Sequence, residues 1–338
     1  MNPVFRVIEP GARTLVQDQG FRNARGIGLP ACGALDRTAM RLVCALLGNP
    51  AQSEVLEMAL SAPTLRAEGE TRAIAEWTAT CLNDGDELRL SPPLRGAVAV
   101  LGIGGGVDLP FVLGSRSTGD KAGFGGFKGR SLAKGDLLPV GVSGAMAGQV
   151  DRRFSLPLRP ETGPICVVAG PQTEIFTEAA YATFFGTGHL VTPRMDRMGR
   201  RLDAQHFEHT GPGAADIISD GAAPGAIQVS GNGLPIILLA DAQTTGGYPK
   251  IAAVARADLP RLAACVPGDM LRFIGVTVAE AEAAARAEDR HLVEVEASIT
   301  EFAGTSRDLV AFFGPEPHNR HSGHDPPRPL PRTYFRPG

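Results

Sequence analysis

The sequence has few aromatic residues, no long apolar run and little net charge, and each shortage excludes a class of protein. One Trp and three Tyr in 338 residues indicate a core that is aliphatic and alanine-rich. No stretch of 18 apolar residues is present and the N-terminus lacks a signal-peptide pattern, so no membrane association is predicted. A formal net charge of −3 gives no electrostatic reason to expect nucleic acid as a partner.

Cysteine is scarce, and the standard motifs for nucleotide and metal binding are missing. The five cysteines show neither CxxC spacing nor an even disulfide framework, which favours a reducing, cytoplasmic location. Residues 102–106 lack the spacing of a dinucleotide fingerprint, and residues 126–131 lack the Lys position of a Walker A loop. No metal site is predicted, because the three histidines at spacing three (His318, His321 and His324) lie in a Pro-rich segment without apolar periodicity.

Glycine and proline, by contrast, are abundant, and their distribution predicts a β-rich protein. The 42 glycines and 27 prolines are mostly spread out, so they separate many short strands. Four helices are also expected, from cap residues and apolar spacing. They cover Asp36–Leu47, Thr173–Phe185, a short segment from Asp258, and an Ala-rich segment that opens on Thr277 with Glu280 as its capping-box partner.

The length exceeds the usual limit for a single core and predicts two domains. We expect an N-terminal β-barrel-like domain at residues 1–150 and a C-terminal one at residues 160–290, with a linker over Ser143–Pro160. Residues 292–313 form an extension whose structure stays open, since Leu292–Val295 has the composition of a short strand. Residues 314–338 are expected to be a disordered tail.

The most informative stretch is a predicted hairpin followed by a polar loop. Ile227–Ser230 and Pro235–Ala240 have the composition of strands, and the Gly-Asn-Gly sequence between them indicates a tight turn. The second strand is apolar on both faces and is expected to be buried. The loop Gln243–Pro249 then gathers amide, hydroxyl and phenol groups beside bare backbone N–H groups, as binding loops on rigid strands do.

This stretch resembles the family of allophanate hydrolase subunit 2-like proteins. That family includes KipA, the C-type subunit of 5-oxoprolinase and the biotin-dependent carboxyltransferase domain of urea amidolyase. Further similar motifs extend the resemblance over roughly residues 4 to 285. They are Thr14–Gly20, Gly28–Asp36, Gly105–Pro110, Leu113–Thr118, Gly123–Gly126, Gly170–Gln172, Asp196–Gly199 and Pro267–Asp269.

The resemblance implies a mainly β fold with short helices, made of two cyclophilin-like β-barrel domains. It implies a C-type subunit of an ATP-dependent 5-oxoprolinase, which opens 5-oxoproline to glutamate with a KipI-like (B-type) partner and an A-type subunit. ATP is then shared with or supplied by the partners. Two alternatives remain: a carboxyltransferase component that acts on urea or a similar small amide, with biotin carried on another protein, and a non-catalytic regulatory partner.

Candidate site residues follow from the chemistry of an amide substrate, whose carbonyl oxygen needs fixed donors. Backbone N–H groups of a Gly-Gly turn can bind an anion, and a plain tight turn is the alternative. Arg197 can bind a carboxylate or phosphate as a fork or pair with Asp196 or Asp220. Arg116 faces the cleft or a partner subunit, and a structural turn is the alternative. The predicted catalytic residues are Tyr248, Lys250, Asp241 and Gln228, and the predicted substrate-binding residues are Thr244, Thr245, Gly246, Gly247, Arg197 and Arg116.

Overall fold

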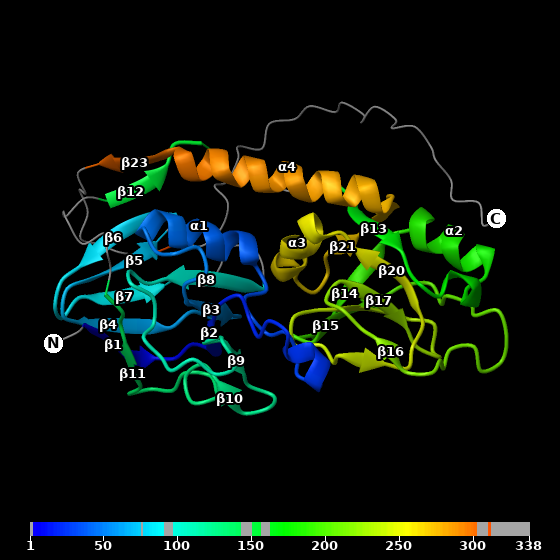
Figure 1. Cartoon of the computed structure of the whole chain (residues 1–338), viewed down its shortest axis with the longest axis horizontal. Coiled ribbons are helices and arrows are strands. Elements are labelled where there is room, and N and C mark those ends of the chain that lie inside the picture. Colours follow the sequence, from blue (N-terminus) through cyan, green and yellow to red (C-terminus); the bar gives the residue numbers. More distant parts are fainter. Residues whose placement is uncertain are drawn as a thin grey trace.

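The computed structural model describes residues 3–75, 77–90, 97–142, 151–156, 163–302 and 310–311. Two β-rich bodies lie side by side, and one long helix, α4 (Val278–Ala297), lies across both (Figure 1). The described residues 3–142, 151–156, 299–302 and 310–311 form what we call the first body, and residues 163–275 form the second body. The fold class is mainly β with short helices, as the sequence predicted.

The first body contains three sheets and a short ribbon. Their strand orders are β11-β1-β4-β7-β24, β23-β12-β6-β5, β2-β3-β8 and β10-β9. Two core clusters fill this body. One lies around Phe5, Leu56 and Leu101, and the other packs under the helix at residues 37–47. The strands are β1 (Val4–Glu9), β2 (Arg13–Gln17), β3 (Val55–Ala59), β4 (Thr64–Glu68), β5 (Thr71–Ala75), β6 (Thr78–Leu82), β7 (Glu87–Leu90), β8 (Val98–Gly102), β9 (Thr118–Gly119), β10 (Phe124–Gly125), β11 (Leu137–Pro139), β12 (Asp151–Phe154), β23 (Ile299–Phe302) and β24 (Val310–Ala311).

The second body is an eight-stranded sheet that nearly closes into a barrel. Its order is β21-β14-β15-β18-β17-β20-β13-β22. The two edge strands are consecutive in the chain and are separated by Arg272 alone, so the two edges of the sheet meet. The strands are β13 (Ile165–Ala169), β14 (His189–Met195), β15 (Gly199–Asp203), β17 (Ala226–Val229), β18 (Pro235–Leu238), β20 (Lys250–Val254), β21 (Met270–Leu271) and β22 (Phe273–Gly275), with a separate ribbon of β16 (Asp220–Gly221) and β19 (Thr245–Gly246).

Short helices flank the sheets, and their caps follow the sequence. The Asp36 side chain accepts a hydrogen bond from the backbone N of Ala39 at 2.7 Å, and Gly48 ends the same helix in the left-handed conformation. Thr277 and Glu280 form the predicted capping box of α4. The other helices are η1 (Ala24–Ile27), α1 (Arg37–Leu47), η2 (Thr173–Ile175), α2 (Glu178–Gly186), η3 (Arg256–Asp258) and α3 (Leu259–Ala264).

One predicted helix is interrupted. The segment Thr173–Phe185 was expected to be continuous, but it divides into η2 and α2. Phe176 is extended and buried between them, and it forms a β-bridge with His209. Thr177 then caps α2 through the backbone N of Ala180. Burial of the Phe176 ring therefore overrides the local helical preference.

The predicted linker and extension also differ from the structure. Strand β12 lies within the proposed linker Ser143–Pro160 and pairs with β6 and β23. Residues Leu292–Val295 continue α4 instead of forming a strand, because Leu292 and Val295 bury against Leu42 of α1. The predicted boundaries at residues 150 and 160 stay predictions. The tail at 314–338 lies outside the described residues.

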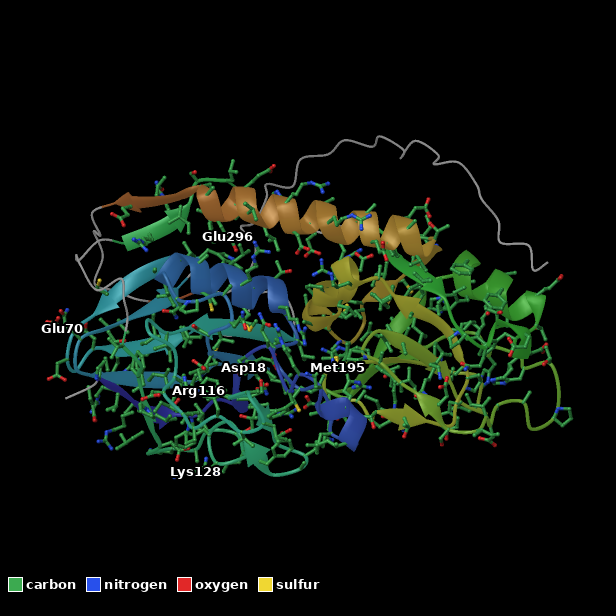
Figure 2. The ribbon with its side chains drawn as sticks, in the orientation of Figure 1. Asp18, Glu70, Arg116, Lys128, Met195 and Glu296 are labelled. Carbon is green, nitrogen blue, oxygen red and sulfur yellow. The ribbon has the colours of Figure 1, made fainter. Side chains whose placement is uncertain are left out.

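Helix α4 fixes the two bodies relative to each other. Its N-terminal half contacts β13 and η3 of the second body, and its C-terminal half packs on α1. The guanidinium of Arg41 donates to Glu296 at 2.9 Å, and Figure 2 shows Glu296 between α4 and α1. Within the described part of the chain, no helix has the length and apolar character that crossing a bilayer requires.

Candidate functional site

The polar loop Gln243–Pro249 is held in place by a two-stranded ribbon beside the barrel. Gly246 pairs with Asp220, and Thr245 pairs with Gly221. The carbonyl of Thr244 accepts a hydrogen bond from Ala222 N at 2.9 Å. These contacts bring the predicted residues Thr244, Thr245 and Gly246 together. Gly247 continues the same ribbon, since its carbonyl accepts a hydrogen bond from the backbone N of Ile217 at 2.8 Å.

Lys250 and Gln228 lie side by side on one face of the barrel. They are direct partners in the pairing of β20 with β17, so their side chains point the same way. Both are buried, with 4% and 1% of their surface exposed. The Lys250 ammonium forms an ion pair with Asp220 at 3.0 Å, whereas the Asp220 side chain is 52% exposed. Hydrogen bonds from Lys250, then Gly221 and Gln172, hold the pKa of Asp220 below its ordinary value.

Gln172 connects to the same pair, although the sequence analysis did not select it as a site residue. Its Oε1 accepts a hydrogen bond from the backbone N of Lys250 at 3.0 Å, and its Nε2 donates to Asp220 at 3.2 Å. Gly170 permits this approach, because a Cβ there would lie 1.9 Å from the carbonyl oxygen of Lys250. The signal was present in the motif Gly170–Gln172, which places a glutamine two residues after an obligatory glycine.

The Gln228 side chain packs against the polar loop and forms hydrogen bonds with it. Its Oε1 accepts from Gln243 Nε2 at 3.3 Å, and its Nε2 donates to the carbonyl of Tyr248 at 3.4 Å. A side chain at Gly246 would meet the Gln228 amide at 2.6 Å, so the loop packs directly against it. Both ends of the Gln228 amide are thus engaged by the protein. Tyr248 itself is 40% exposed at the edge of the loop.

Arg197 and Asp241 form a separate, buried ion cluster. Asp241 accepts from Arg197 at 2.8 and 2.9 Å, Glu57 of β3 binds the Nη1 of the same guanidinium, and the carbonyl of Gly33 accepts at 2.7 Å. Burial lowers the pKa of Arg197, but the carboxylates of Glu57 and Asp241 outweigh it and raise the pKa above its ordinary value. Arg197 is 3% exposed, so it lies inside the seam between the bodies and not at the rim of a site. Neither Asp196 nor Asp220 is its partner.

Arg116 belongs to the first body and is not brought together with Lys250. Its guanidinium binds Glu54 and Asp108, each at 3.0 Å, and lies over the ring of Phe111. Its backbone N donates to Asp18 at 2.7 Å. In Figure 2, Arg116 and Asp18 lie together in the first body, with Met195 across the seam. These contacts favour the structural alternative for Arg116.

Three hydrogen bonds join the first body to the second body at and near the polar loop. The Nη2 of Arg25, in η1, donates to the carbonyls of Ala222 and Gln243. The backbone N of Cys32 donates to the carbonyl of Ala240 at 2.9 Å. Burial, followed by the nearby charge of Asp241, raises the pKa of the Cys32 thiol to about 12. Because the thiolate is the reactive form, Cys32 is not a nucleophile at neutral pH.

A known protein family covers most of the chain, including both bodies and the polar loop. Residues 27–275 match the family described as carboxyltransferase domain, subdomain A and B. The chain belongs to this family.

Relatives of this carboxyltransferase-family chain include a free subunit and segments of larger enzymes. The C-type subunit of 5-oxoprolinase from Escherichia coli (strain K12) is 35% identical over 86% of this chain and 97% of its own length. The urea amidolyase of Lachancea kluyveri is 29% identical over 86% of this chain but only 18% of its own length. The crystal structure of the Kluyveromyces lactis urea carboxylase has a TM-score of 0.79 at 29% identity, covering 90% of this chain and 30% of that one. The chain therefore spans a minor part of the fungal enzymes.

The site of this carboxyltransferase-family chain offers cationic and neutral donors but no clustered metal ligands. Among the described residues, no group of three or more His, Cys, Asp or Glu side chains is placed to hold a metal ion. An ammonium group has three N–H donors, and Asp220 is the side-chain acceptor recorded for Lys250 within the described residues. Lys250 can therefore also donate to the carbonyl oxygen of an amide. The Lys250 side chain is 5% exposed, and that of its partner Asp220 is 52% exposed.

Proposed function

We propose that this chain is the C-type subunit of an ATP-dependent 5-oxoprolinase, which opens the lactam of 5-oxoproline to glutamate. The observation that carries the proposal is its 35% identity with a C-type subunit of 5-oxoprolinase over nearly the whole length of that relative. A second C-type subunit of 5-oxoprolinase, from Haemophilus influenzae, is 30% identical over 98% of its length. The match to nearly the whole length of two such subunits supports the proposal.

The Lys250 site suits this reaction. Opening a lactam places negative charge on the carbonyl oxygen, and a fixed cationic donor stabilises that charge most where water is excluded. Lys250 is buried, and its ammonium is oriented by Asp220. Tyr248 is exposed at the loop edge and can supply a second donor. The assigned roles are therefore electrostatic stabilisation by Lys250 and Tyr248 and positioning by Asp220, Gln172 and Gln228.

ATP and partner subunits complete the proposal. The sequence contains no phosphate-binding loop of the Walker type, so ATP is shared with or supplied by a KipI-like B-type partner and an A-type subunit. None of the five cysteines forms a disulfide in the described structure, which suits the reducing cytoplasm where ATP is available. The isolated chain is accordingly expected to show negligible turnover.

A second candidate function is biotin-dependent carboxyl transfer to urea or a similar amide. The observation that favours it is the structural likeness to the urea carboxylase of Kluyveromyces lactis, with a TM-score of 0.79. Biotin would then arrive on another protein. A third candidate, a non-catalytic regulatory partner, predicts no turnover with any partner.

The test is reconstitution of the full chain with its partner subunits. Conversion of 5-oxoproline to glutamate that requires ATP and every subunit is the expected result, measured as glutamate released. Avidin-sensitive activity contradicts the proposal in favour of carboxyl transfer. Robust lactam hydrolysis by the single chain contradicts the requirement for partners, and absence of turnover in every combination supports the regulatory role.

A further inference from the structure

A cavity of about 340 Å³ in the first body is lined by three arginines. Arg22 and Arg25 come from the segment around η1, and Arg37 is the first residue of α1. The residues that line it include no Asp or Glu. An arginine guanidinium matches the geometry of carboxylate and phosphate groups. Three of them around one small space thus form an environment that favours an anion.

None of these three arginines forms a salt bridge within the part of the chain that the structure describes. Most other arginines with recorded side-chain contacts pair with a carboxylate, such as Arg116 with Glu54 or Arg130 with Asp136. Desolvation, and then the neighbouring charge of Arg22, lower the pKa of Arg37. The charges of Arg22 and Arg37 therefore disfavour each other, and a bound anion relieves this repulsion.

Arg25, one of the residues that line the cavity, has a donor group without a partner in the described part of the chain. Its Nη1 is buried and has no hydrogen-bond partner among the described residues, whereas its Nη2 is bound to the carbonyls of Ala222 and Gln243. A buried donor without a partner costs free energy unless a ligand or water satisfies it. The bonds of Nη2 also hold the guanidinium against the loop that precedes Lys250, so one residue of the cavity contacts that loop.

Asp18 is a carboxylate whose charge acts on Arg37, but its oxygens are already engaged. They accept hydrogen bonds from Gly20 N at 2.7 Å, Arg116 N at 2.7 Å, Ser115 Oγ at 2.6 Å and Ser117 Oγ at 2.5 Å. Asp18 raises the pKa of Arg37 only as a minor opposing influence. It therefore does not occupy the place of a ligand between the arginines.

The walls of the cavity limit what it can hold. Phe21 lines it and packs against Phe124, with the ring centroids 4.9 Å apart. Ligand cavities begin at about 300 Å³, so this one fits a molecule of amino-acid size. We propose that the three-arginine cavity binds a small oxyanion, either the carboxylate of the lactam substrate or a phosphoryl group, next to the Lys250 site. The assignment of the carboxylate rests on the proposed function.

Binding of small anions to the full purified chain tests the proposal. The probes are 5-oxoproline, inorganic phosphate and 2-pyrrolidinone, which is the same lactam without the carboxylate, titrated by calorimetry at low ionic strength. Binding of 5-oxoproline but not of 2-pyrrolidinone identifies the carboxylate, and binding of phosphate alone identifies a phosphoryl group. No saturable binding of either anion overturns the proposal.

The double variant Arg22→Gln, Arg37→Gln tests whether these arginines hold the anion. Arg37 makes one long hydrogen bond, to the carbonyl of Gln19 at 3.3 Å, and Arg22 and Arg37 are both exposed residues, so folding is expected to be unaffected. A charge-assisted hydrogen bond contributes enough that the loss of the two arginines should weaken anion binding by at least about tenfold. Arg286→Gln is the matched control, because Arg286 is exposed on α4, across the molecule from η1 (Figure 1). Unchanged affinity in the double variant overturns the proposal.

The reconstituted complex separates this proposal from the proposed function. The double variant is expected to raise the KM for 5-oxoproline while the kcat is largely kept, since Lys250 is untouched. If the wild-type complex is active and the double variant has an unchanged KM, the carboxylate assignment is wrong although the proposed function stands. If the complex is inactive but anion binding depends on Arg22 and Arg37, the proposed function is wrong and the anion site stands.

Discussion

Removal of Arg197 should destabilise the protein more than any other single loss of charge in the described structure. Its guanidinium binds Glu57 from the first body and Asp241 from the second, and all three side chains are buried. Arg197→Met leaves two buried carboxylates without a counter-charge. Breaking a buried pair in this way costs about 3–5 kcal/mol, against a total stability of about 5–15 kcal/mol for a typical protein.

The free energy of unfolding, measured by urea titration, tests this expectation. Replacing the whole cluster with neutral groups (Arg197→Met, Glu57→Gln and Asp241→Asn together) should recover most of the loss, because no buried charge remains. Arg41→Met is the control: its pair with Glu296 is partly exposed, so the cost should stay below about 1 kcal/mol. A loss below about 1 kcal/mol for Arg197→Met, or a triple variant less stable than the single one, refutes the reasoning.

Three further predictions concern the site, pH and the tail. In the assembled complex, Lys250→Ala and Tyr248→Phe should each lower turnover on the order of 10²-fold with the melting temperature unchanged. The control Lys134→Ala, on the surface, should change neither turnover nor melting temperature. Full turnover in both site variants would show that the loop is structural. Burial raises the pKa of Asp36 to about 6, so the folded state binds this proton more tightly than the unfolded state, whose pKa is about 3.9, and stability falls as the pH rises from about 4 to 6. Asp36→Asn keeps the acceptor for the helix cap and should therefore raise the unfolding free energy at pH 7, by at most about 3 kcal/mol for a shift of roughly two pKa units, and by nothing below pH 4. An equal effect at both pH values contradicts the titration. Truncation after Phe313 should cost less than about 1 kcal/mol in thermal unfolding, and a larger drop in melting temperature shows that the tail contributes to the core.

Local sequence signals correctly predicted the elements whose stability is local. The caps of α1 and α4 follow from Asp36 and Thr277, since these side chains satisfy N–H groups three residues away. The hairpin of β17 and β18 follows from its turn. The helix expected at Thr173–Phe185 failed where long-range packing of Phe176 was stronger than helix propensity. The partners of Arg197 were not predictable, because Glu57 lies 140 positions away.

The sequence by itself determined a mainly β fold, the strongest helix caps and the residues of the polar loop, because these depend on backbone propensity and short-range hydrogen bonds. Only the tertiary structure decided which polar groups meet. In the folded protein, Gln172 and Asp220 bind Lys250, and Arg197 and Asp241 pair in the buried seam between the bodies. Three arginines line one cavity. The physical reason is that pairing of charges depends on distance in space and on burial, and neither is encoded by spacing along the chain.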